Sequence, residues 1–271
     1  MKDAPPKPVR FGDLGLRLAS GLAMAAVALV DVWLGGFWVA ALVALALVLM
    51  LWELAQMVTG KGDLDAPAFL IPALAGAAAV FTTLVAGIAI GIAVLLVGAA
   101  LAAVLTGRGA GWMAAGLLYM GVAMCALIPL RHLEPNGILF VLWLILVVVA
   151  TDVGAYFVGR MVGGPRLWPS VSPGKTRSGA LGGLAFAVLV GLPIGIAAGL
   201  GPIETAALSL GTSVASQAGD LLESAVKRRF GVKDASHLIP GHGGVMDRLD
   251  GVMGGVWFVA ICGMVGLGSL G

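Results

Sequence analysis

Residues 219–251 read GDLLESAVKRRFGVKDASHLIPGHGGVMDRLDG, and they hold ten charged side chains in a chain that is 60% hydrophobic and only 11% charged. In the first half, Asp220, Glu223, Ser224 and Lys227 follow the spacing i, i+3, i+4 and i+7. This spacing predicts a helix with two carboxylates, a hydroxyl and an ammonium group on one face. The second half is rich in glycine and contains Pro240, which predicts an irregular loop.

The predicted loop ends on Asp247 and Asp250, three residues apart at the start of the last apolar segment. Glycines let a backbone approach a ligand closely and offer N–H groups to an anion. Carboxylates, cationic clusters and a glycine-rich turn together indicate a site for a hard divalent cation and phosphate oxygens. The alternative is a charged cytoplasmic loop between two membrane helices, but such a loop would scatter its carboxylates.

The rest of the chain has the composition of a membrane protein, because 60% hydrophobic residues and 42 glycines exclude an ordinary soluble domain. A helix needs about 20 apolar residues to cross the hydrocarbon core of a bilayer. We therefore predict an all-α polytopic protein, since lipid leaves no backbone group unsatisfied. About nine transmembrane helices are expected, at residues 16–34, 36–58, 67–84, 86–106, 111–130, 136–158, 179–200, 203–226 and 252–270. Residues 1–15 are predicted to be a cytoplasmic tail, and residues 16–271 a single integral-membrane catalytic domain.

The positions of the basic residues predict how the chain is oriented in the membrane. With a cytoplasmic N-terminus, only Arg131 falls on the extracytoplasmic side, which favours an extracytoplasmic C-terminus and an odd number of spans. The polar segments 151–179 and 219–251 would then face the cytoplasm at the inner membrane. The basic residues assigned to the cytoplasmic side are Lys2, Lys7, Arg10, Arg17, Lys61, Arg108, Arg160, Arg166, Lys175, Arg177, Lys227, Arg228, Arg229, Lys233 and Arg248.

The acidic residues of the spans share one depth. Ionisable groups inside membrane spans are costly and usually mark function. The common depth predicts one site near the cytoplasmic leaflet, open to water on one side and to lipid on the other. Glu53 shares this depth, but we expect it to be only a carboxylate at the end of a span, without a functional role. The acids concerned are Glu53, Asp152, Asp220, Glu223, Asp247 and Asp250.

The second polar segment, residues 151–179, contains a Gly-Lys-Thr sequence at 174–176. It is not a P-loop, because the first glycine of that motif is missing and a membrane helix stands where a strand should precede it. Ser172, Lys175 and Thr176 still have the chemistry of phosphate binding, with Lys175 as a point charge on a flexible loop. An anchor that sets the topology is the alternative function of this segment.

The motif of residues 224–250 resembles the signature of the phosphatidate cytidylyltransferases, also called CDP-diacylglycerol synthases. It runs Ser224-Ala-Val-Lys227-Arg228, four further residues, Lys233-Asp234, and then Pro240-Gly-His242-Gly-Gly-Val-Met-Asp247-Arg248-Leu-Asp250. The second polar segment is similar to the family's other characteristic region, with Asp152, Gly154, Tyr156 and Ser-Pro-Gly-Lys-Thr in the same order. A departure is Gly251, where many members have serine.

The resemblance implies an enzyme that joins CTP and phosphatidate, releases pyrophosphate and leaves CDP-diacylglycerol in the membrane. We expect Asp220, Asp247 and Asp250 to hold Mg²⁺, while Glu223 either completes the metal shell or orients a lysine. The expected catalytic residues are Asp220, Lys227, Asp247, Arg248 and Asp250. The expected phosphate-binding residues are Ser172, Lys175, Thr176, Ser224, Arg228, Lys233 and His242, with Asp152 as a further candidate. A second, monovalent cation such as K⁺ and a homodimer are left open, and no nucleic acid is expected as a partner.

Two other functions are compatible with parts of the pattern. A secondary transporter also uses buried carboxylates and glycine-broken helices, but it places them near the membrane midplane and shows paired repeats. A membrane kinase for a lipid alcohol would need a general base and would release a nucleoside diphosphate instead of pyrophosphate.

Overall fold

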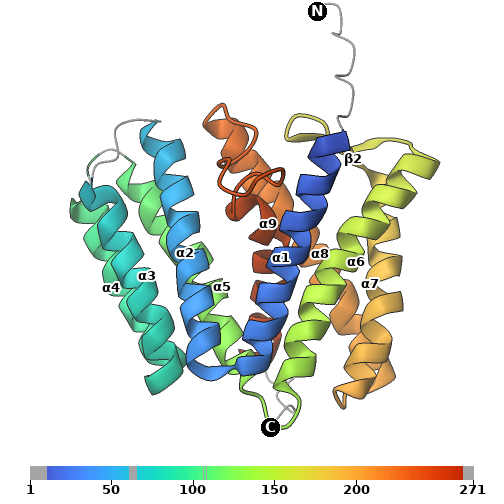
Figure 1. The fold of residues 1–271 in the computed structure, drawn as a ribbon, viewed down its shortest axis with the longest axis horizontal. Helices are drawn as coiled ribbons and strands as arrows, with labels where there is room; N and C mark the ends of the chain where they lie inside the picture. The colour runs from blue at the N-terminus through green and yellow to red at the C-terminus, as the bar shows by residue number, and fades with distance from the viewer. Residues whose placement is uncertain (1–10, 61–65, 106, 108, 265–271) are drawn as a thin grey trace, which may run out of the picture.

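The computed structural model describes residues 11–60, 66–105, 107 and 109–264. The described residues form nine α-helices and one short hairpin (Figure 1). The helices are α1 (Phe11–Leu34), α2 (Gly36–Thr59), α3 (Ala66–Ala86), α4 (Ile88–Leu105), α5 (Ala110–Arg131), α6 (Gly137–Val162), α7 (Arg177–Ala197), α8 (Pro202–Arg229) and α9 (Met246–Met264). Most of the predicted tail, and the end of the last predicted span, lie outside the described residues. So do the basic residues Lys2, Lys7, Arg10, Lys61 and Arg108, and the Arg17 side chain.

The helices run side by side, and successive connections alternate between the two ends of the bundle (Figure 1). The α6–α7 and α8–α9 connections lie at the same end as the start of α1, whereas α9 finishes at the opposite end. Both polar segments predicted from the sequence therefore meet at one end of the molecule.

Six helices in the described part of the chain, α2 to α7, are long and apolar enough to cross a membrane. The apolar part of α1, Leu18–Leu34, is shorter. Helix α8 carries many hydroxyl and charged side chains, and α9 begins with charged residues. The chain is thus an all-α membrane protein in its main architecture, while nine spans and their orientation remain predictions.

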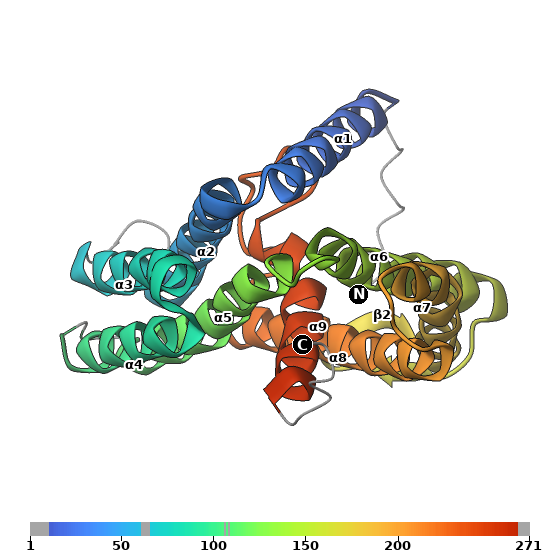
Figure 2. The same cartoon turned by 90° about the horizontal axis from the view of Figure 1, so that it is seen from below.

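Polar side chains of α8 are buried between helices instead of facing lipid. The Trp143 indole N–H of α6 donates to Ser209 Oγ (3.3 Å), and Thr151 Oγ1 donates to Ser213 Oγ (2.8 Å). Figure 2 shows α9 near the middle of the bundle, beside α5 and α8. Helix α9 therefore lies in the interior of the bundle, and α8 turns one face toward its neighbours, where its polar groups find partners.

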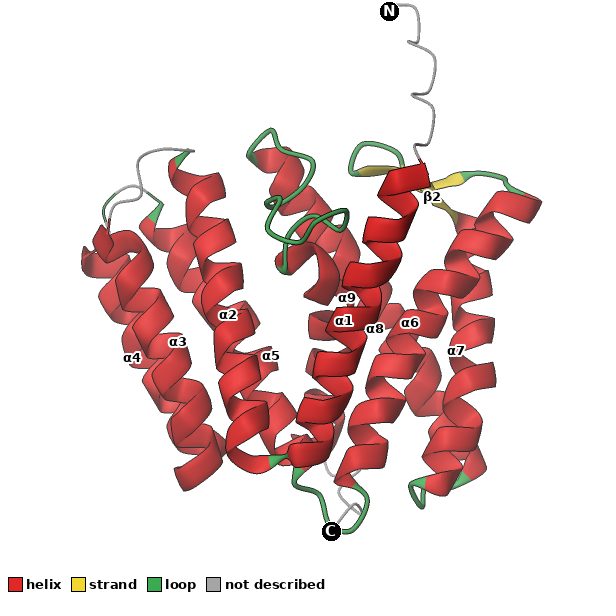
Figure 3. Ribbon diagram, viewed as in Figure 1, coloured by secondary structure: helices red, strands yellow, loops and turns green. Residues whose placement is uncertain are grey.

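A short antiparallel hairpin joins α6 to α7 and was not predicted from the sequence (Figure 3). Strand β1 (Arg166–Trp168) pairs with β2 (Ser172–Thr176), with Arg166 opposite Thr176 and Trp168 opposite Ser172. Strands this short, one of them containing Pro173 and Gly174, give no apolar alternation to detect.

The last helix begins at Met246, six residues before the predicted span 252–270. Its polar first turn was missed because a span was defined by hydropathy alone, whereas carboxylates satisfy the N–H groups at this helix start. Asp247 and Asp250 lie in the first turns of α9, at the start of the last apolar segment as expected.

Candidate active site

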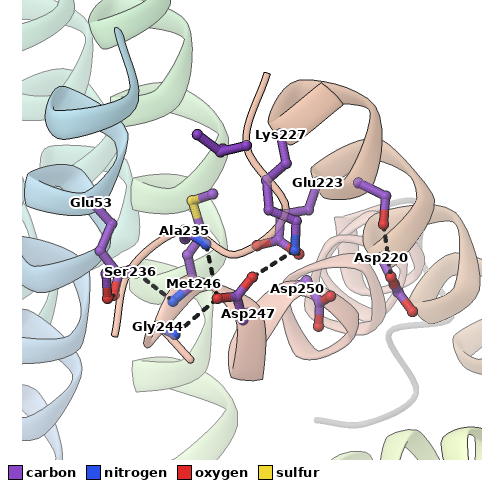
Figure 4. A network of polar contacts seen from close by, with 12 residues as sticks. Glu53, Asp220, Glu223, Lys227, Ala235, Ser236, Gly244, Met246, Asp247 and Asp250 are labelled. Atoms are coloured by element: carbon purple, nitrogen blue, oxygen red, sulfur yellow. Dashed lines mark hydrogen bonds and ion pairs between the residues drawn. The ribbon is translucent and has the colours of Figure 1, made fainter. Parts of the chain in front are cut away.

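Three carboxylates from two helices converge at the polar end of the bundle (Figure 4). Asp220 and Glu223 lie one turn apart on α8, and Asp250 lies on α9. One oxygen from each lies within 4.8 Å of the others. Carboxylates this close repel one another unless a proton or a positive charge compensates them.

The surroundings of the Glu223 side chain indicate whether a cation fits among the three carboxylates. Its side chain is 5% exposed, and its Oε1 accepts no hydrogen bond from any donor in the described part of the chain. A buried carboxylate oxygen without a donor is costly unless something else compensates its charge. The donor set, three hard oxygen ligands around one point, suits Mg²⁺.

Lys227 lies between this cluster and Asp247. Its Nζ donates to Glu223 Oε2 (3.1 Å) and to Asp247 Oδ1 (2.6 Å), and the residue is only 9% exposed. On the other side of the cluster, Lys175 of β2 forms an ion pair with Asp220. This second pair ties the hairpin to α8 and so joins the two polar segments.

The contact network is electrically unbalanced. It contains the four carboxylates of Asp220, Glu223, Asp247 and Asp250, and the two ammonium groups of Lys175 and Lys227. Two negative charges are therefore left over within the network. A bound divalent cation would bring it to neutrality.

Asp247 lies outside the three-carboxylate cluster, which differs from the ligand set expected from the sequence. Its Oδ2 accepts hydrogen bonds from the backbone N–H groups of Ala235 (3.0 Å) and Gly244 (2.8 Å), while Oδ1 faces Lys227. Its position in the first turn of α9 explains this, because backbone N–H groups without helical partners lie within reach there. Asp247 thus fixes the loop and orients Lys227.

A cavity of about 650 Å³ opens beside the cluster, between α6, the hairpin, α7 and α8. Its lining combines acidic and basic side chains with small or apolar residues. Such a lining suits a ligand with a phosphate group and an apolar portion. The polar lining residues are Asp152, Tyr156, Arg160, Arg166, Lys175, Thr176, Gln217 and Asp220.

Four further residues expected at the site are found at the cavity or the cluster. Asp152 and Lys175 line the cavity, and Ser224 Oγ lies 3.4 Å from Asp220 Oδ1. Thr176 also lines it, but its Oγ1 accepts a hydrogen bond from Gly179 N (3.0 Å) as the N-cap of α7. The Thr176 hydroxyl therefore has a structural role, which is to cap α7.

The remaining expected phosphate ligands lie in other surroundings. Arg228 donates to the backbone oxygens of Val171 (3.4 Å) and Val232 (3.0 Å), which ties the two polar loops together. His242 Nδ1 lies 2.9 Å from Ser20 Oγ of α1. Ser172 is half-buried in β2, and the side chains of Lys233 and Arg248 are exposed.

Arg160 and Arg166 line the cavity but were interpreted from the sequence only as topology determinants. Arg160 donates to the Tyr156 hydroxyl (2.8 Å), and Arg166 donates to Gly174 O (3.3 Å). The signal that could have identified them was their proximity in sequence to Asp152 and Lys175.

Glu53 of α2, expected only as a carboxylate at the end of a span, is fully buried and lies six residues before the last residue of α2, Thr59. Its Oε1 accepts hydrogen bonds from Ser236 Oγ (2.6 Å) and Val245 N (2.8 Å), and its Oε2 from Met246 N (2.7 Å). Figure 4 shows it pointing toward the loop that precedes α9.

Comparison of the sequence with known proteins finds a matching family and similar relatives. The model of a family described as the Cytidylyltransferase family matches residues 15–265. The chain is 48% identical over 158 residues to the phosphatidate cytidylyltransferase of Brucella suis biovar 1, which is 58% of this chain and 58% of that protein. It is 40% identical over 143 residues to the Bacillus subtilis protein of the same name, 52% of this chain and 53% of the relative. The aligned region thus spans little more than half the length of these relatives.

Proposed function

Because the chain belongs to the cytidylyltransferase family, we propose that it transfers the cytidylyl group of CTP to phosphatidate. The products would be CDP-diacylglycerol, which stays in the membrane, and pyrophosphate. The observation that carries this proposal is the three-carboxylate cluster beside a cavity lined with basic side chains. The names of the relatives support the same reaction.

The carboxylates of Asp220, Glu223 and Asp250 would hold Mg²⁺. When bound there, the ion shields the triphosphate charge and stabilises the departing pyrophosphate. The unpartnered oxygen of Glu223 and the excess negative charge of the network support this assignment. Lys227, held by Asp247, fixes Glu223 in its place.

The reaction requires no protein nucleophile and no general base. A phosphate monoester has a second pKa of about 6, so the phosphatidate headgroup is largely dianionic at neutral pH. One of its oxygens attacks the α-phosphorus of CTP, a new P–O–P linkage forms, and the bond to the β-phosphate oxygen breaks. The enzyme's task is to position two anions and to lower their repulsion.

Basic side chains would divide the two phosphate groups. Lys175, Arg160 and Arg166 line the cavity, and we assign them to the lipid phosphate because apolar residues continue from them along α6 and α7. Arg248 and Lys233 are exposed and do not line the cavity, and we assign them to the triphosphate.

We also infer that this end of the bundle faces the cytoplasm, where CTP is available. The support is the gathering of basic side chains there, with Arg131 at the opposite end. The orientation can be tested with a variant in which Cys125 and Cys262 are replaced by alanine and Lys233 by cysteine. An impermeant maleimide should label it in inverted membrane vesicles and not in sealed right-side-out vesicles, and the reverse pattern would refute the orientation.

The activity test uses purified full-length protein, phosphatidate in detergent, Mg²⁺ and CTP labelled at the α-phosphate. Transfer of label to lipid with an equal amount of pyrophosphate supports the proposal, and Asp250→Asn should abolish both. A lipid kinase would release CDP and leave the lipid without the α-label. A transporter would turn over neither substrate, so either result would refute the proposed reaction.

A further inference from the structure

We propose that Glu53 of α2 is a positioning residue that holds the first turn of α9 at the active site. It lies nearly two hundred residues before α9 in the sequence. The inference rests on the proposed function for its catalytic consequence. Its structural part stands on the contacts of Glu53 alone.

Glu53 acts as a cap for α9 that another helix supplies. The N–H groups at the start of a helix have no partner within it. At α9, those of Val245 and Met246 both donate to the Glu53 carboxylate, at 2.8 and 2.7 Å. Val245 O accepts the first helical bonds, from Arg248 N and Leu249 N, so these donors stand at the very start of the helix. A negative charge is favourable at that point of a helix.

The loop before α9 is fastened to the same carboxylate. Ser236 Oγ donates to Glu53 Oε1 at 2.6 Å, so both ends of the segment 236–246 meet at one side chain. Gly244 approaches so closely that an added Cβ would lie 2.4 Å from Glu53 Oε1. At least one glycine of the glycine-rich loop thus makes room for a buried carboxylate of this chain instead of for a ligand.

The position of α9 decides the geometry of the site. Asp247, which holds Lys227, follows directly after the two amides that Glu53 binds. Asp250, a member of the carboxylate cluster, lies one turn further along the same helix. A displacement of this helix start would move both carboxylates relative to Asp220 and Glu223 on α8. Catalysis by positioning is sensitive to such shifts, since about 1 Å can cost roughly 100-fold in rate.

The variant Glu53→Gln tests the assignment, because glutamine keeps the shape but turns an N–H donor toward a backbone N–H donor. We expect kcat to fall roughly 10- to 100-fold while the KM values for CTP and phosphatidate change less than about twofold. Hydrogen exchange of the peptide covering 236–246 should become faster. Glu134→Gln, an exposed carboxylate at the opposite end of the bundle, is the matched control and should change neither quantity.

Gly244→Ala approaches the same contact from the loop side and should reproduce both effects. In the double variant with Glu53→Gln, the two changes should be less than additive, because they disturb one contact. If Glu53→Gln does not fold, Ser236→Ala removes only one of the three hydrogen bonds and should still speed the exchange of that peptide.

Unchanged kcat in Glu53→Gln, or unchanged exchange of the 236–246 peptide, would overturn the proposal. A rise in KM with kcat preserved would also overturn it, since that pattern indicates lost substrate binding. If the wild-type protein makes no CDP-diacylglycerol, the proposed reaction fails, but the exchange measurement still decides whether Glu53 holds α9.

Discussion

Replacing Lys227 by methionine should destabilise the folded protein strongly, because it removes the ammonium group that pairs with both Glu223 and Asp247. At an effective dielectric constant of about 20, the contacts at 3.1 and 2.6 Å correspond to Coulomb attractions of about 5 and 6 kcal/mol. Most of this attraction offsets the cost of burying the ammonium group. Breaking a buried pair on one side nevertheless costs about 3–5 kcal/mol, since the partner charges stay buried.

Thermal unfolding in detergent measures this effect. At about 2–4 °C per kcal/mol for a chain of this size, Lys227→Met should lower Tm by about 6–20 °C. Added Mg²⁺ should recover part of the loss, because the variant has a larger excess of negative charge at the proposed metal site. Lys233→Met is the control, as it removes an exposed lysine, and should shift Tm by less than about 2 °C. A Tm of Lys227→Met equal to that of the wild type would refute the buried ion-pair network.

Three further predictions concern the hairpin and the helices around the cavity. Lys175→Met should raise the KM for phosphatidate more than that for CTP, and equal effects in steady-state kinetics would contradict the lipid-side assignment. Thr176→Val removes the N-cap of α7 and should lower the free energy of unfolding by about 1 kcal/mol; an unchanged denaturation midpoint would exclude that role. Gly154→Ala would place a Cβ 2.6 Å from Phe186 and 2.9 Å from Gly182 O. The free energy of unfolding, measured by thermal unfolding, should therefore fall by about 1–3 kcal/mol. Stability equal to the wild type would mean that α6 and α7 separate easily.

The sequence predicted those features that depend on local spacing. Asp220, Glu223 and Lys227 share one helical face at i, i+3 and i+7, and this periodicity needs no knowledge of the fold. The ends of α2 and α5 were predicted to within one residue, because hydropathy changes sharply where those helices end. The convergence of Asp220 with Asp250 was also expected, from their common depth in the membrane.

The individual hydrogen-bond partners of side chains that are distant in sequence could not be predicted. Glu53 is separated from Val245 and Met246 by 192 and 193 residues, and no periodicity connects them. The spacing of Asp247 and Asp250 suggested one shared role, but only the folded loop brings Ala235 and Gly244 to Asp247. A carboxylate that binds backbone amides and one that lies in a carboxylate cluster look identical in the sequence.

The account depends most on the joint binding of a divalent cation by Asp220, Glu223 and Asp250. Electron paramagnetic resonance of Mn²⁺ added to the purified wild-type protein, with Mg²⁺ as competitor, measures that binding directly and without substrate. We expect Glu223→Gln and Asp250→Asn each to weaken Mn²⁺ binding by at least about tenfold, with Glu134→Gln unchanged. Wild-type affinity in both cluster variants would contradict the central claim.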